Sequence, residues 1–83
     1  MDNRDANYYI DKLDKLKYEY FQLNDIYEKR YKLNILYSIL YGVSKMNNVQ
    51  YKDVVIRYIC ADKFLYGLYM DLQKNHYKHA GWV

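Results

Sequence analysis

The side chains in this sequence that could do chemistry are two histidines, one cysteine, two serines and an unusually large set of 13 tyrosines. His76 and His79 are three residues apart, so on a helix they share a face and could reach one metal ion. A closed zinc site needs four ligands, however, and a catalytic one usually three. The next soft ligand, Cys60, lies about four helical turns away along the same expected helix. We therefore predict no metal site and interpret both histidines as surface residues.

The candidate nucleophiles lack the neighbours that would activate them. Cys60 has no histidine nearby in the sequence, and we interpret it as a small buried apolar residue. Ser38 and Ser44 lie in or beside the longest uncharged stretch, and neither has a local histidine or aspartate. The sequence also contains no glycine-rich phosphate loop and no acidic cluster suited to magnesium. These residues predict a protein that is not an enzyme and that uses no cofactor.

Size and composition favour a single small helical domain. The chain has 83 residues, 13 basic and 10 acidic side chains, a net charge of +3, no proline and three glycines. A lone cysteine excludes an internal disulfide, and we expect a cytoplasmic protein because no signal region or apolar run of ~20 residues is present. The scarcity of proline and glycine predicts long helices. We expect one domain over 1–83, with flexible tails at 1–6 and 76–83.

Two periodic apolar stripes divide the first half of the chain. Steps of four and three residues are typical of a helix with one narrow apolar face. The first stripe is Tyr9, Leu13, Leu16, Tyr20, Leu23 and Tyr27, and the second stripe is Leu33, Leu36, Leu40 and Val43. At ~100° per residue the two stripes point roughly 160° apart on one continuous helix. A single packing partner cannot cover both of them.

The second half of the chain predicts one further helix. A turn is expected between Gly42, as a left-handed helix end, and Asn47, as the next N-cap. The helix after the turn has a stripe of its own: Tyr51, Val54, Tyr58, Ala61, Leu65, Leu68 and Leu72. The expected fold is therefore all-α, an antiparallel helical hairpin with coiled-coil-like stripes. The alternative is a three-helix bundle with a break near Asn24–Asp25, where Asp25 begins a weaker capping box.

The lengths of the two expected helices predict self-association. The first, about 35 residues, would be ~52 Å long, and the second, about 27 residues, would be ~40 Å long. Folded back, the second helix reaches only to Lys17, so that the start of the first stripe has no intramolecular partner. Such exposed apolar rows mark interfaces. We expect a homodimer through Tyr9, Leu13, Leu16 and Tyr20.

The tyrosines and the C-terminal segment provide further candidate contacts. Tyrosine is enriched at interaction hot spots, and four tyrosines lie off the stripes: Tyr18, Tyr37, Tyr66 and Tyr77. Lys78 and Trp82 add a basic and aromatic character to the C-terminal segment. Such a segment also suits nucleic acids, so a nucleic-acid-binding or transcriptional-regulator protein is the alternative function.

The composition gives a last, general indication of function. It is rich in Lys, Asn, Ile and Tyr and resembles that of proteins from AT-rich genomes, including low-GC bacteria and their phages. Small chains of that kind without catalytic residues often bind and block a larger host protein. The resemblance implies a non-catalytic interaction protein, an inhibitor or adaptor, which acts in the host cytoplasm if it is phage-encoded.

Overall fold

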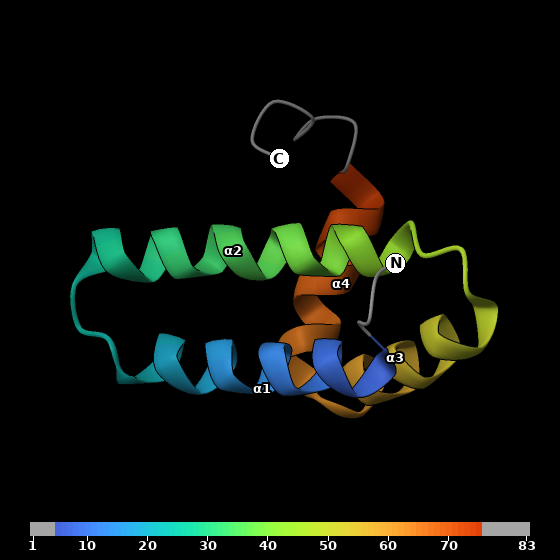
Figure 1. The fold of residues 1–83 in the computed structure, drawn as a ribbon. Coiled ribbons are helices and arrows are strands. Elements are labelled where there is room, and N and C mark those ends of the chain that lie inside the picture. The colour runs from blue at the N-terminus through green and yellow to red at the C-terminus, as the bar shows by residue number, and fades with distance from the viewer. Residues whose placement is uncertain (1–4, 76–83) are drawn as a thin grey trace.

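The computed structural model describes residues 5–75, and over that range it contains four α-helices and no strand, which confirms the all-α class. The helices are α1 (Ala6–Gln22), α2 (Ile26–Ser44), α3 (Val49–Ala61) and α4 (Lys63–Asn75). Helices α1 and α2 run antiparallel, α3 lies near the start of α1, and α4 crosses steeply behind α2 (Figure 1). Of the expected tails, Asp5 caps α1 and Ala6 begins it, whereas 1–4 and 76–83 lie outside the described residues.

The first expected helix is broken between α1 and α2, so the prediction of one continuous helix is wrong and the break lies where the alternative placed it. Leu23 is extended, with φ −80° and ψ 144°. Asp25 then caps α2, and its carboxylate accepts hydrogen bonds from the backbone N–H of Tyr27 at 2.7 Å and of Glu28 at 3.3 Å. The longest extent of the molecule is 36 Å, well below the ~52 Å of the expected rod.

A second break, which the sequence analysis did not predict, separates α3 from α4 at Asp62. Its backbone is extended, with φ −114° and ψ 118°, and its carboxylate accepts a hydrogen bond from the N–H of Leu65 at 3.1 Å. The same carboxylate pairs with the ammonium of Lys17 in α1. Burial alone would raise the pKa of Asp62, but the hydrogen bonds from Lys17 and Leu65 outweigh burial and lower it. One side chain thus caps α4 and ties the α3–α4 junction to α1.

The turn between α2 and α3 lies slightly later in the chain than expected. Helix α2 continues past Gly42 to Ser44, and no residue of the described part of the chain has a positive φ, so the expected left-handed end at Gly42 is wrong. The N-cap of α3 is Asn48 rather than Asn47, and its side chain accepts a hydrogen bond from the N–H of Tyr51 at 3.0 Å. The predicted reversal of the chain is therefore present, with shifted boundaries.

The core contains side chains from all four helices. The buried apolar residues are Ala6, Leu13, Leu16, Leu36, Leu40, Val43, Val55, Ile59, Leu65 and Leu72. Leu13 is 0% and Leu16 8% exposed, so the expectation that these residues lack an intramolecular partner is wrong. The break between α1 and α2 explains this result, because folding the rod back turns two stripes that pointed apart toward each other.

The burial of Leu13 and Leu16 also bears on the homodimer that was predicted through the first stripe. Leu13 and Leu16 belong to the core of the same chain, and Tyr9 and Tyr20 are partly buried against that core. The buried Leu13 and Leu16 are therefore not available as the centre of an interface, whereas self-association of the chain stays a prediction. The structure corrects the exposure that was expected for Leu13 and Leu16.

Two tyrosine hydroxyls connect helices at the edge of the core. Tyr37 of α2 donates a hydrogen bond to the Asp71 carboxylate of α4 at 2.8 Å, and Tyr58 of α3 donates to the Asp14 carboxylate of α1 at 3.1 Å. Burial, together with the hydrogen bond to a carboxylate, raises the pKa of each tyrosine to about 12. The phenolic protons are therefore held more tightly in the folded protein than in the unfolded chain.

We expect alkaline pH to weaken the fold through these two tyrosines. Their contribution is fully present below the unfolded pKa of 10.0 and is lost as the pH rises through about 12, because the unfolded chain releases its protons first. Tyr58→Phe should cost up to about 1 kcal/mol at neutral pH, and its difference from wild type should narrow above pH 10.0. Urea unfolding across this range measures the difference. The control is Tyr66→Phe, which removes the hydroxyl of an exposed tyrosine. If the stability difference between wild type and Tyr58→Phe did not change with pH, the role given to the Tyr58 hydroxyl would be contradicted.

Candidate protein-binding surface

The structure separates the residues that were predicted to contact a partner. Leu13 and Leu16 are core residues, and Tyr9, Tyr20 and Tyr37 are half-buried. Tyr18 on α1 is 67% exposed and Tyr66 on α4 is 44% exposed. Tyr77, Lys78 and Trp82, with His76 and His79, lie outside the described residues. Two of the predicted contacts, Tyr18 and Tyr66, are therefore shown to be open to solvent on the described helices.

The structure also corrects the interpretation of Cys60 as a buried residue. The thiol is exposed rather than buried, because α3 directs Val55 and Ile59 into the core and Cys60 lies one residue beyond Ile59. A step of one residue rotates a side chain by ~100° around a helix. The cysteine therefore faces solvent.

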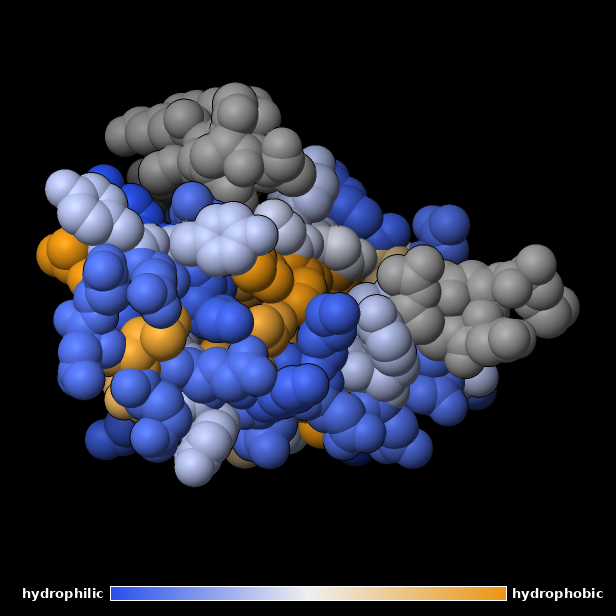
Figure 2. All heavy atoms as spheres, turned by 60° about the vertical axis from the view of Figure 1, so that its left-hand side comes forward, coloured by the Kyte–Doolittle hydropathy of each residue, from blue (hydrophilic) through white to orange (hydrophobic). Residues whose placement is uncertain are grey.

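Large exposed apolar side chains are concentrated where α1 joins α2. We call the following five residues the hairpin-end surface: Tyr18, Phe21, Ile26, Tyr27 and Tyr31. Each is between 54% and 78% exposed. This end of the helix pair projects beyond α3 and α4 (Figure 1), because α4 crosses α2 instead of running along it. Figure 2, in which this end is turned forward, shows apolar side chains at the surface among polar ones.

Aromatic contacts hold Phe21 in place. The centroid of its ring lies 5.2 Å from that of Tyr20 and 4.9 Å from that of Phe64 in α4, both in edge-to-face geometry. The ammonium of Lys29 lies 4.2 Å from the Tyr20 ring centroid and donates a hydrogen bond to the Tyr20 carbonyl at 3.1 Å. Each aromatic pair contributes roughly 0.5–1.5 kcal/mol beyond its burial. Phe21 is thus an exposed aromatic side chain whose position is fixed by its neighbours.

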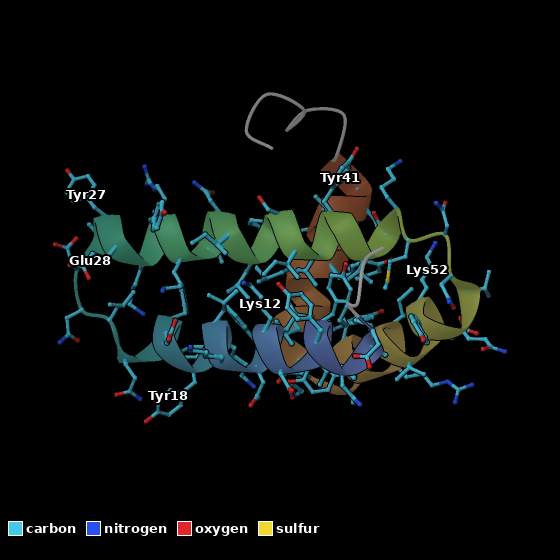
Figure 3. All side chains as sticks on the ribbon, viewed as in Figure 1. Lys12, Tyr18, Tyr27, Glu28, Tyr41 and Lys52 are labelled. Carbon is cyan, nitrogen blue, oxygen red and sulfur yellow. The ribbon has the colours of Figure 1, made fainter. Side chains whose placement is uncertain are left out.

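The hairpin-end surface has two sides, each with a groove. The groove on the α1 side measures about 450 Å³ and is lined by Asp14, Lys15, Lys17, Tyr18 and Phe21. The groove on the α2 side measures about 310 Å³ and is lined by Leu23, Tyr27, Glu28, Tyr31 and Lys32. Tyr18 and Tyr27 point to opposite sides of the hairpin in Figure 3. A partner could therefore contact one side or enclose the end of the hairpin.

Charged side chains next to both grooves are engaged in ion pairs between elements. Lys17 pairs with Asp62, and Lys32 pairs with Glu19 across the hairpin at 3.0 Å. Because these charges compensate each other locally, the surroundings of the aromatic side chains carry no strong field of one sign. This arrangement is typical of an apolar contact area with a mixed polar rim.

Two further features are absent from the described part of the chain. Between residues 5 and 75 no group of three or more His, Cys, Asp or Glu side chains could hold a metal ion. None of the helices in that range is long and apolar enough to cross a membrane. No family model, curated protein or solved structure matches the chain. The exposed surface is therefore the basis on which a function can be proposed.

Proposed function

We propose that the protein is a non-catalytic interaction module that binds a larger protein through its hairpin-end surface and acts sterically, as an inhibitor or adaptor. The observation that carries the proposal is the group of five large, exposed apolar side chains between residues 18 and 31. They lie around the connection between α1 and α2, at the end of the helix pair that projects beyond α3 and α4 (Figure 1). The cytoplasmic setting expected from the sequence is part of the same proposal.

The physical character of these side chains supports protein binding. Tyrosine and phenylalanine bury a large area with few rotatable bonds, so fixing them in an interface costs little entropy. Here they lie on helices rather than loops, and the Phe21 ring is already positioned by Tyr20 and Phe64. Preorganised aromatic anchors of this kind supply most of the energy at protein interfaces.

Nucleic-acid binding is less well supported. The residues on which that alternative was based belong to the C-terminal segment, which lies outside the described residues. The two hairpin-end grooves include the carboxylates of Asp14 and Glu28. Because nucleic-acid affinity depends on neutralising phosphates with basic side chains, a groove of mixed charge favours a protein partner.

The test compares the proteins captured from a lysate of the source cells by wild type and by two double variants. Tyr18→Ala/Phe21→Ala removes the aromatic rings of the α1 side, and Tyr27→Ala/Tyr31→Ala removes those of the α2 side. At least one double variant should weaken binding of the captured partner by more than about tenfold, as loss of a hot spot does. The matched control is Val49→Ala/Val54→Ala, which shortens two exposed apolar side chains of α3 and should bind like wild type.

Two results would contradict this proposal. One is capture of the same partner with unchanged affinity by both hairpin-end variants. The other is capture of nucleic acid alone, with an affinity that falls steeply as salt is added. Thermal melting of each variant shows that a loss of binding is not a loss of folding.

A further inference from the structure

A smaller pocket lies away from the hairpin end, where the end of α2 meets α3 and α4. Its volume is about 180 Å³, and it is lined by Tyr41, Ser44, Lys45, Lys52, Tyr69, Leu72 and Gln73. Tyr41 and Lys52 lie at the opposite end of the molecule from Tyr27 in Figure 3. The volume corresponds to about six water molecules at ~30 Å³ each. It is below the ~300 Å³ of the smallest pockets for drug-sized ligands, so that only a small ligand fits.

The charged side chains of this pocket are both lysines. The ion pairs among residues 5–75 are Lys17 with Asp62 and Lys32 with Glu19, and neither Lys45 nor Lys52 takes part in them. Lys52 is half-buried. The ammonium of Lys45 lies 5.5 Å from the Tyr41 ring centroid. Two positive charges without a carboxylate thus line one confined space.

Helix electrostatics explains the position of one lysine only. Lys45 stands at the carbonyl end of α2, where a positive charge is favourable. Lys52 lies in the first turn of α3, a turn without acidic residues, where the helix end already carries partial positive charge. Lys52 therefore has no compensating acidic residue in its own helix turn, and it lines the same pocket as Lys45.

Neutral donors complete the lining. Burial raises the pKa of Tyr69, so that its hydroxyl stays protonated and can donate a hydrogen bond. The side-chain amide of Gln73 supplies further N–H donors. The Ser44 hydroxyl is already engaged, because it donates to the Tyr41 carbonyl at 2.6 Å. The free donors of the pocket suit an acceptor with several oxygens.

We propose that this pocket binds a small phosphate-bearing anion, with Lys45 and Lys52 as its charged donors. A phosphate group carries about −1.5 to −2 charges near neutral pH and three strong acceptor oxygens, which matches two ammonium groups and the donors beside them. Inorganic phosphate and the phosphate group of a small metabolite share this chemistry. The site is separate from the hairpin-end surface and does not depend on the function proposed for that surface.

The test is a titration of the full chain with inorganic phosphate that is monitored by the NMR signals of the backbone amides. Sodium chloride keeps the ionic strength constant throughout the titration. Saturating shifts are expected at the amides of Ser44, Lys45, Lys52 and Gln73. Lys45→Gln and Lys52→Gln should each weaken binding by about tenfold, because each removes a charge-assisted hydrogen bond. The matched control is Lys63→Gln, which removes the same charge from an exposed position in α4 and should leave the affinity unchanged.

A second titration with glycerol phosphate separates the two sources of the anion. Tighter binding than that of inorganic phosphate identifies a phosphorylated small molecule as the ligand, and equal or weaker binding identifies the free ion. The proposal is overturned if the shifts do not saturate. It is also overturned if Lys63→Gln weakens binding as much as the two pocket variants, because the effect then reflects net charge alone. Glutamine keeps the helix propensity of lysine, and thermal melting checks that all three variants are folded.

Discussion

Replacing Leu13 by alanine is expected to lower the free energy of unfolding by about 2–5 kcal/mol. The Leu13 side chain is 0% exposed in a core to which the described helices contribute ten buried apolar residues, so that its removal leaves a cavity that few neighbours can fill. Domains of this size have about 5–15 kcal/mol of total stability. A single truncation therefore removes a large share of it.

Urea unfolding followed by circular dichroism measures this loss. Ile26→Ala is the matched control, because Ile26 is a large apolar residue of similar size that lies 67% exposed at the start of α2. It should change the stability by no more than about 0.5 kcal/mol. Equal effects of the two substitutions would contradict the assignment of Leu13 to the core. A midpoint that rises with protein concentration would instead indicate self-association of the chain.

The second large effect is expected at Asp62. Asp62→Ala should destabilise the protein by about 1–3 kcal/mol, because it removes both the cap of α4 and the ion pair with Lys17. Asp62→Asn keeps a side-chain oxygen that can cap the helix and removes only the charge, so its cost should be clearly smaller. The comparison of the two variants separates the two roles of this carboxylate.

The pH dependence gives an independent check on Asp62. Its pKa is lowered in the folded protein from an unfolded value of 3.8. The stabilisation by the charged form is therefore present above that value and is lost as the pH falls below it. The difference between wild type and Asp62→Asn should close in acid. The control is Asp53→Ala, which removes an exposed carboxylate of α3. If Asp53→Ala lowered the stability as much as Asp62→Ala, the role given to Asp62 would be contradicted.

Helix content and the turn after α2 could be predicted from the sequence, but the break between α1 and α2 depended on tertiary energetics. The local signal at Asp25, a helix cap, is worth only about 1 kcal/mol. Burying a leucine such as Leu13 or Leu16 stabilises by roughly 1.5–3 kcal/mol, and the break allows both to be buried. Summed over the two facing stripes, burial outweighs the few helical hydrogen bonds lost at the break. Helix signals that are judged residue by residue along the sequence do not include this free energy of burial.

The break at Asp62 could not be found from apolar periodicity. The spacing of three and four residues continues through this position from Ala61 to Leu65, as it would in an uninterrupted helix. The break also changes which residues are buried. Val55 and Ile59 fill the core, one residue later than the predicted Val54 and Tyr58 at each turn. Asp62 itself, as a possible N-cap, was the available signal.

The candidate surface was predicted in part. Tyr18 was selected because it lies off the stripes, and it is exposed, although its role in binding stays a prediction. Tyr27 was assigned to the first stripe, but it is 78% exposed because it follows the break and points away from the core. Phe21 and Tyr31 were not among the residues predicted to contact a partner. The density of aromatic residues on both sides of the Asp25 cap was the signal that could have identified them.

The short connection between α1 and α2 also bears on the speed of folding. Only residues 23–25 separate the two helices, so bringing their buried faces together closes a very small loop at little entropic cost. Chains whose contacts are mostly local cross their folding barrier in microseconds to milliseconds. The α1–α2 pair is thus suited to act as the early nucleus onto which the later helices dock.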